Sequence, residues 1–405
     1  MNRITWRGLQ LLILIAMAPM PALAQSDQPT ARAPRREFEG PIAVSDVKPH
    51  IEHLASKELR GRSHAEGRKA GEYVRKHFEA AGLKPLFGDG QSFFQEIPAR
   101  NPQTQERYIA GRNVGGVIHG TDAELRNEYI ILSAHYDHLG VRGGKIYRGA
   151  DDNASGVSML LSVAKHFHNT KHQPKRSIVF LGFDMEEKML WGSRWFVAHP
   201  PWPIGNVKFF LTADMIGRSL GNLPLPTVFV MGSEHSPLVK LALDDVGSPK
   251  GLEAARLGID LIGPVPRSDY GPFRAKKIPF LFFSTGEHPD YHTPNDLPER
   301  IDHEKVARIS SLIARLSKQL GSQSEAPVWT DELKPHIDEA KALNKICSLL
   351  MKANDDEEYK LTDLQKVVIS QAVLKTKRII TRGKMSANER KELISVAQVL
   401  LLSVF

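Results

Sequence analysis

Residues 177–188 read Ser-Ile-Val-Phe-Leu-Gly-Phe-Asp-Met-Glu-Glu-Lys, an apolar run that passes directly into an acidic one. A run as continuous as Ser177–Phe183 is typical of a strand covered on both faces, as in the parallel sheets of α/β proteins. The acids that follow, Asp184, Glu186 and Glu187, repel one another, so the cluster needs a cation or has raised carboxyl pKa values. The stretch therefore predicts a buried strand ending at a polar site, with a solvated acidic loop as the alternative.

Similar apolar runs recur along the chain and alternate with helical patterns. Helices are expected from Ser45, over residues 65–81 and over residues 155–167, and the strand-like runs are 114–118, 129–134, 207–213, 228–231 and 279–283. This alternation predicts an α/β fold with a mixed, mostly parallel central sheet flanked by helices. In such a sheet, ligands bind beyond the carboxyl ends of the strands.

The N-terminal segment has the pattern of an export signal. A basic start, an apolar run at residues 11–17 and an Ala-x-Ala-like stretch ending at Ala24 predict a signal peptide over residues 1–24. The alternative is an uncleaved anchor, but the apolar run is short for a membrane span. Residues 25–40 are expected to form a flexible leader and residues 41–322 the main domain. We therefore expect a periplasmic or secreted protein that is free of the membrane after cleavage.

The C-terminal residues 325–405 contain three helical patterns and no strand-like run, which predicts a small helical appendage. Capping boxes at residues 362–365 and 386–389 mark two of the helix starts. One helical face is expected to collect the apolar side chains of Leu364, Val367, Val368, Leu374 and Ile379. Such a face usually packs against a core, and the alternative is a surface for a partner or substrate.

The composition is that of a soluble globular protein, with 25 % charged residues among 405. The net charge of +8 is scattered among acids and forms no basic stripe, so no nucleic-acid partner is expected. A single cysteine, Cys347, excludes an internal disulfide. Stability outside the cytoplasm must then come from the core and from bound metal.

Histidines and acids stand at several predicted strand ends. His135 closes one strand, Asp214 follows another, and His292 lies in the loop after residues 279–283. Asp137 is placed to hold the second imidazole nitrogen of His135, which would make that histidine a better metal ligand. Nitrogen and carboxylate ligands without a thiolate favour zinc, with manganese or cobalt as alternatives.

Two adjacent acids, Asp151 and Asp152, lie in the glycine-flanked segment 149–156 that opens a helix. Either carboxylate could bridge two metal ions, and helix capping is the alternative role. The spacing of the residues does not choose between the two acids.

Taken in order, five motifs resemble those of peptidase family M28: His-x-Asp (135–137), Gly-Ala-Asp-Asp-Asn-x-Ser-Gly (149–156), Glu-Glu (186–187), Asp-Met (214–215) and Tyr-His-Thr (291–293). The resemblance runs from about Asp46 to Leu320. It implies the zinc exopeptidase fold and a pair of co-catalytic zinc ions, and it extends to glutamate carboxypeptidases and glutaminyl cyclases as relatives.

The resemblance also implies roles for individual residues. It makes Glu186 the general base and Asp137 the partner of His135. It also implies two zinc ions: His135 and Asp214 would bind one, Glu187 and His292 would bind the other, and Asp152 would bridge them. Tyr270 stands where the family commonly has a histidine. It is expected to stabilise an oxyanion, and a pocket wall or a packed aromatic are the alternatives.

The implied activity is hydrolysis of peptides with a free N-terminus by an exported di-zinc aminopeptidase. The alternatives are a carboxypeptidase or dipeptidase, for which Arg218 would clamp the substrate carboxylate rather than pair with a structural acid. An amidase acting on acylated amino acids, a glutaminyl-cyclase-like enzyme and a non-catalytic binding relative also remain open.

Overall fold

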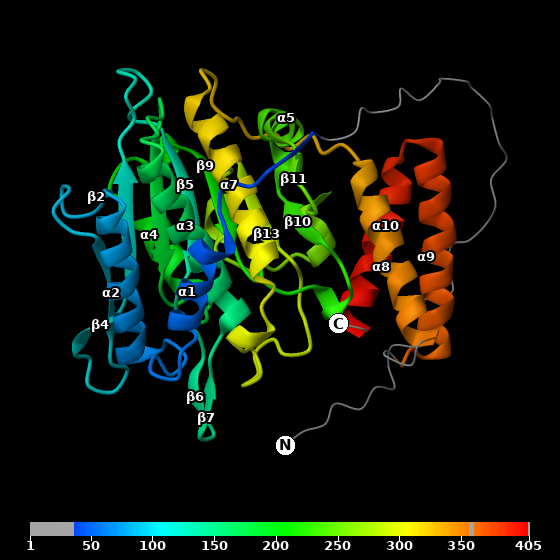
Figure 1. The fold of residues 1–405 in the computed structure, drawn as a ribbon, viewed down its shortest axis with the longest axis horizontal. Helices are drawn as coiled ribbons and strands as arrows, with labels where there is room; N and C mark the ends of the chain where they lie inside the picture. The colour runs from blue at the N-terminus through cyan, green and yellow to red at the C-terminus, as the bar shows by residue number, and fades with distance from the viewer. Residues whose placement is uncertain (1–35, 356–359, 404–405) are drawn as a thin grey trace. The chain divides into compact units, whose positions relative to one another are not determined.

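The computed structural model describes residues 36–355 and 360–403 (Figure 1). The predicted signal peptide and most of the predicted leader therefore lie outside the described residues. No helix in the described ranges combines the length and the apolar character needed to cross a membrane.

A nine-stranded mixed sheet forms the centre of the fold (Figure 1). Its strands lie in the order β12 (Glu253–Leu257), β10 (Thr227–Met231), β13 (Phe280–Ser284), β9 (Val207–Ala213), β5 (Tyr129–His135), β8 (Ser177–Phe183), β4 (Arg107–Ile118) and β2 (Lys84–Pro85), with β3 (Phe94–Arg100) also paired to β4. Two small ribbons pair β1 (Glu37–Phe38) with β11 (Ser248–Pro249), and β6 (Gly140–Arg142) with β7 (Lys145–Tyr147).

The middle of the sheet is parallel, and this decides where functional side chains meet. Strands β13, β9, β5 and β8 run in one direction. Antiparallel pairing begins outside them, where β10 meets β13 and β4 meets β8. The carboxyl ends of the four central strands therefore lie along one edge of the sheet.

Helices cover both faces of the sheet. One hydrophobic core joins it to α1 (Val44–Leu54), α2 (His64–Ala80), α3 (Gly156–Asn169), α5 (Pro237–Val246) and α7 (His303–Ser322). A second core, on the other face, includes α4 (Trp191–Ala198), α6 (Tyr270–Ala275), α8 (Ile337–Asp355), α9 (Asp363–Arg382) and α10 (Ala387–Ser403). In β8, Phe180 belongs to the first core and Leu181 to the second. The continuous apolar run of that strand thus reflects burial on both faces.

The three predicted C-terminal helices are present as α8, α9 and α10, and both capping boxes form. The predicted apolar face of α9 is wrong, however, except at Ile379, which is buried. Leu364, Val367 and Leu374 are each more than half exposed. The buried positions are Ile369, Ala372, Thr376 and Ile379, whose spacing of three and four residues places them on one side of the helix.

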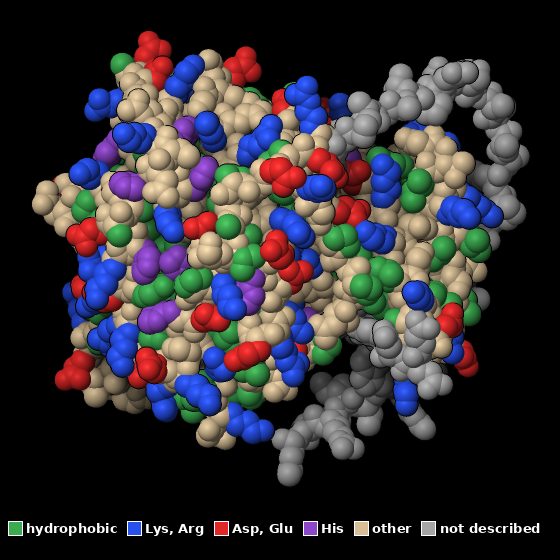
Figure 2. Space-filling model, viewed as in Figure 1, with side chains coloured by type: hydrophobic (Ala, Val, Ile, Leu, Met, Phe, Trp, Pro, Cys, Tyr) green, Lys and Arg blue, Asp and Glu red, His purple; other side chains and the backbone are tan. Residues whose placement is uncertain are grey.

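The surface agrees with the scattered charge of the sequence. On the face drawn in Figure 2, lysine and arginine side chains are interspersed with aspartate and glutamate. Cys347 is buried, and burial raises the pKa of its thiol to about 12.

Candidate metal centre

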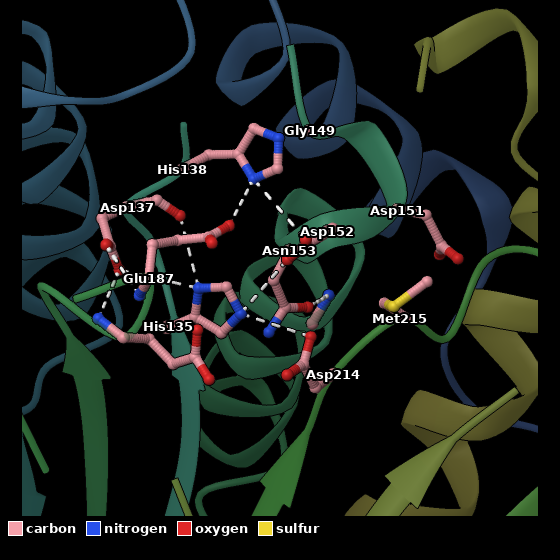
Figure 3. A network of polar contacts seen from close by, with 12 residues as sticks. His135, Asp137, His138, Gly149, Asp151, Asp152, Asn153, Glu187, Asp214 and Met215 are labelled. Atoms are coloured by element: carbon pink, nitrogen blue, oxygen red, sulfur yellow. Dashed lines mark hydrogen bonds and ion pairs between the residues drawn. The ribbon is translucent and has the colours of Figure 1, made fainter. Parts of the chain in front are cut away.

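The functional side chains come from the ends of the four parallel strands and from the turn before α3, which carries Asp152. His135 is the last residue of β5, and Asp214 directly follows β9. Glu186 and Glu187 follow β8, and His292 lies in the loop after β13. Figure 3 shows His135, Asp152, Glu187 and Asp214 converging beyond the strand ends.

One group of ligand atoms forms around His135. Its Nε2 atom lies 3.2 Å from Asp214 Oδ1 and 3.3 Å from Asp152 Oδ1. All three side chains are buried, and their ligand atoms lie within 4.8 Å of one another. This is a nitrogen and carboxylate set of the kind that binds zinc.

A second group lies on the other side of Asp152. Its Oδ2 atom is 3.0 Å from His292 Nε2 and 3.6 Å from His138 Nδ1. Glu187 approaches both imidazoles, with Oε1 2.8 Å from His138 and Oε2 3.3 Å from His292. Asp152 thus presents one carboxylate oxygen to each group.

The turn before α3 separates the two adjacent acids (Figure 3). Asp151 points away from the centre, where its Oδ1 accepts a hydrogen bond of 2.6 Å from the Gly217 amide. The carboxylate of Asp296 accepts hydrogen bonds from the amides of Asp151 and Asp152, at 2.9 and 3.0 Å. These contacts turn Asp152 towards His135, His138 and His292, whereas Asp151 Oδ2 lies 3.3 Å from His288 Nε2.

Arg62 also holds this turn in place, although no sequence motif predicted a role for it. Its guanidinium is fully buried and donates to the main-chain oxygens of Tyr136, Gly149 and Asp152, at 2.8, 2.8 and 3.2 Å. The side chain thereby ties the loop after β5 to the turn that carries Asp152. Its contacts join segments far apart in the chain, so no local pattern could have revealed it.

Asp137 holds the glutamate loop in place. Its carboxylate accepts hydrogen bonds from the amides of Glu186, at 3.0 Å, and Glu187, at 3.3 Å. The distance from Asp137 Oδ1 to His135 Nδ1 is 3.6 Å, longer than a hydrogen bond. The side chain thus lies beside His135, where the sequence predicts it, and its direct contacts orient the two glutamates.

The two adjacent glutamates have opposite protonation behaviour. Burial raises the pKa of Glu186 well above its ordinary value; His135 opposes this shift and the charge of Asp214 adds to it. Burial also acts to raise the pKa of Glu187, but contacts with His138 and His292 lower it on balance. Such a difference in pKa between neighbouring acids is typical of sites in which one acid stays ionised and the other transfers a proton.

The imidazole of His138 is a candidate ligand that the sequence motif did not mark. The side chain is buried, and neither ring nitrogen has a hydrogen-bond partner of good geometry within the described residues. Glu187 Oε1 lies 2.8 Å from His138 Nδ1 and likewise has no hydrogen-bond partner of good geometry within the described residues. Unsatisfied buried donors and acceptors beside a cluster of carboxylates fit a cation-binding site.

Residues 113–317, about half of the chain, match the model of peptidase family M28. The chain belongs to this family. The match covers every residue of the two ligand groups. The resemblance noted from the five sequence motifs is thereby confirmed, as is the α/β fold.

Relatives of this M28 chain include the aminopeptidase YwaD of Bacillus subtilis, which is 27 % identical over 56 % of this chain and 48 % of its own length. The chain spans only 11 to 48 % of the length of the first curated relatives it matches. In fold it is similar to BSAP, a zinc aminopeptidase from Bacillus subtilis (16 % identity, TM-score 0.53, covering 73 % of this chain and all of that one). It is equally similar to the glutaminyl cyclase of Porphyromonas gingivalis (18 % identity, TM-score 0.54, covering 69 % and 99 %).

Two tyrosines of this M28 chain, Tyr270 and Tyr291, lie in different surroundings near the centre. The ring of Tyr270 is buried and stacks between Phe280 and Phe282, with its hydroxyl accepting a hydrogen bond from the Arg267 amide. These contacts fit the packed-aromatic alternative. Tyr291 instead lines a cavity together with Asp152, Glu186 and Asp214, and its ring stacks on His292.

Arg218 pairs with an acid of the protein itself. It donates to Asp290 Oδ2 at 3.0 Å and to Asn222 Oδ1 at 2.8 Å. Arg300 donates to the same Asp290 oxygen at 2.7 Å. Arg218 therefore has the contacts of a structural ion pair rather than those of a free clamp for a substrate carboxylate.

Proposed function

We propose that the chain is an exported di-zinc aminopeptidase that removes N-terminal residues from peptides. The observation that carries this proposal is the position of Asp152, whose two carboxylate oxygens face two separate groups of ligand atoms. A carboxylate shared in this way suits two metal ions bound side by side. The aminopeptidase named among the relatives supports the choice of peptide substrate.

In this proposal His135 and Asp214 hold one zinc ion, Glu187 and His292 hold the other, and Asp152 bridges them. The donor set fits zinc, since it consists of imidazole nitrogens and carboxylate oxygens. His138, whose ligand atom groups with those of Asp152 and Glu187, offers a further imidazole to the second ion. When bound, the two ions would polarise the scissile carbonyl and lower the pKa of a water molecule.

Glu186 is the proposed general base. It lines the same cavity as Asp152 and Asp214, and burial holds its pKa well above the ordinary value. A carboxylate with a raised pKa can accept a proton from the attacking water and then donate it to the leaving amine. Asp137 acts as a positioning residue by holding the amides of Glu186 and Glu187.

The first test compares Glu186→Gln with the wild-type protein. The variant should retain its zinc, because Glu186 is not a proposed ligand, and lose about 10²–10⁴-fold in kcat. Bound metal is measured on the mature protein, and activity is measured on aminoacyl anilides. Glu304→Gln, on the exposed side of α7, is the control and should keep full activity. Near-complete activity of Glu186→Gln would refute its role as the base.

The substrate class is tested with free and N-blocked peptides. An aminopeptidase should cleave only substrates with a free N-terminus, and a chelator should abolish the activity. Equal cleavage of N-blocked substrates would favour an amidase or another peptidase instead. One zinc per chain together with cyclisation of N-terminal glutamine would favour a glutaminyl-cyclase-like enzyme, whose fold this chain also shares.

Export is a separate part of the proposal. We propose that residues 1–24 direct the protein out of the cytoplasm and are removed. The measurement is the N-terminal sequence of the protein recovered from the periplasm or the medium, which should begin at Gln25. An intact Met1 in that fraction would contradict the cleavage.

A further inference from the structure

A cavity of about 240 Å³ connects the candidate metal centre to the C-terminal helices. Asp152, Glu186 and Asp214 line its polar end. Its middle is apolar and is lined by residues of the sheet and the adjoining loops, among them Phe229, Met231, Leu257, Leu261 and Phe282. The far end is lined by α8 and α10.

The far end of the cavity belongs to residues outside the family match. Ala342, Leu343 and Ile346 of α8 and Ala397 and Leu400 of α10 line it, whereas the match to family M28 ends at residue 317. These five side chains are buried in the second core and still border the cavity. The appended helices therefore close a space that begins at the catalytic groups.

A cluster of ion pairs holds these helices against the sheet. Arg390 of α10 donates to both carboxylate oxygens of Asp260, at 2.8 and 2.5 Å, and to Glu339 of α8, at 2.8 Å. Glu339 in turn accepts from the Gly258 amide at 2.8 Å. A Cβ atom at Gly258 would clash with Arg390 and approach Glu339 to 2.8 Å. The loop that carries Leu261 is thus fixed to both helices at one point.

The size of the cavity limits what it can hold. An apolar cavity of about 150 Å³ accommodates a benzene ring, so the present volume of about 240 Å³ exceeds the needs of one phenylalanine side chain. Beyond the three acids, the charged lining residues are paired with other residues of the protein, Arg267 with Glu287 and Glu339 with Arg390. The rest of the wall is mainly apolar, so a mainly apolar occupant fits it. A linear group of about eight carbons or more fits both conditions.

We propose that α8 and α10 form the far wall of the substrate pocket, and that this pocket selects substrates with a long apolar group next to the scissile bond. The proposal rests on the hydrolytic function proposed above. The apolar group is the side chain of the N-terminal residue. An acyl chain on its nitrogen would instead indicate the amidase alternative. Selectivity then depends on helices that lie outside the family match.

The test uses substrates of increasing length on the full-length, zinc-loaded protein. Anilides of alanine, leucine and 2-aminodecanoic acid form one series, and N-octanoyl-alanine anilide is the acylated arm. Each methylene buried should raise kcat/KM about fourfold, so the long substrate should exceed the alanine substrate by more than a hundredfold. Preference for 2-aminodecanoyl identifies a side-chain pocket, and preference for the octanoyl substrate identifies an acyl pocket.

Variants in the appended helices test the far wall. Ala342→Trp fills the cavity from α8 and should lower the ratio of kcat/KM for long over short substrates at least tenfold. Leu343→Ala enlarges the cavity and should shift the preference to a longer chain. Leu374→Trp, on the exposed side of α9, is the matched control and should leave the ratio and the activity unchanged. Zinc content and Tm are measured for each variant to identify those that fail to fold.

Binding of n-decylamine, measured by calorimetry, tests the apolar pocket separately from the proposed hydrolytic function. Loss of this binding in Ala342→Trp, with zinc and Tm retained, supports the pocket even if no amide is cleaved. Conversely, hydrolysis of all substrates at rates that do not depend on chain length would overturn the pocket and leave the hydrolytic function intact. An unchanged ratio in both Ala342→Trp and Leu343→Ala would also overturn it.

Discussion

Two tyrosines near the centre differ in what their hydroxyl groups can reach. Burial raises the pKa of Tyr291, and the surrounding carboxylates raise it further, so its phenol stays protonated. A protonated phenol lining the cavity can donate a hydrogen bond to the carbonyl oxygen of a bound peptide. Tyr270 lies between two phenylalanines and outside the cavity lining.

We therefore expect Tyr291→Phe to lower kcat about 10²–10³-fold with little loss of zinc, and Tyr270→Phe to change kcat only a few-fold. The magnitude is that of one lost transition-state donor. Steady-state kinetics with bound metal measured in parallel gives the comparison. A larger loss in Tyr270→Phe than in Tyr291→Phe would restore the oxyanion role expected from the sequence.

Other residues could not be assigned from the sequence for a related reason. The adjacency of Asp151 and Asp152 does not tell which faces the ligands, because the choice depends on Asp296 and Gly217, far along the chain. His138 stands three residues after His135, yet its contact with Glu187 exists only because β5 and β8 are neighbours. The sequence motif identified the neighbourhood of these residues, and the packing assigned their directions.

At the scale of elements, the start of α3 is tightly packed against its neighbours. Gly156 opens this helix so close to β9 that a Cβ atom would clash with Asn153 and with the main-chain oxygen of Ala213. The side-chain Nδ2 of Asn153 donates a hydrogen bond to that same oxygen at 2.9 Å. This close approach couples the turn that carries Asp152 to the strand that precedes Asp214.

Gly156→Ala should therefore destabilise the fold by about 2–4 kcal/mol, in the upper range for point mutations. Urea unfolding of the metal-free protein measures the change. Gly205→Ala is the matched control, because no atom lies within 4 Å of its Cβ position, and it should be close to neutral. Equal stability of the two variants would contradict the close contact.

The helices and strands themselves were largely predictable. Strands β8 and β9 have the predicted bounds, because a run of apolar residues is a local signal. The buried face of α9 was mispredicted because several helix faces of that segment carry apolar residues. Only the neighbouring elements determine which of those faces is covered.

At the scale of the whole molecule, buried histidines link stability to pH. Burial lowers the pKa of His50 to about 3, and repulsion from His77 and Lys165 adds to the shift. Burial also lowers the pKa of His172, to about 4. The unfolded chain binds these protons near pH 6.5. The stability that the neutral imidazoles provide is therefore complete above pH 6.5 and is lost as the pH falls towards 4.

His50→Gln should accordingly show a smaller loss of stability than the wild type between pH 7 and pH 4.5. The difference reaches at most about 1.4 kcal/mol per pH unit, the limit for one proton. Urea unfolding across this pH range, with chelator present in all samples, measures it. His119→Gln, at an exposed position, is the control and should follow the wild-type profile. Parallel profiles for His50→Gln and the wild type would exclude His50 as a source of acid sensitivity.

The sequence by itself determined the buried strands, their alternation with helices, and the strand ends that carry acids and imidazoles. These features are local, and parallel strands necessarily bring their carboxyl ends to one edge. Only the tertiary structure decided that Asp152 faces both ligand groups, that Tyr291 and not Tyr270 lines the cavity, and that α8 and α10 close the cavity. Each of these depends on contacts between segments distant in the chain, and packing, rather than local pattern, selects such contacts.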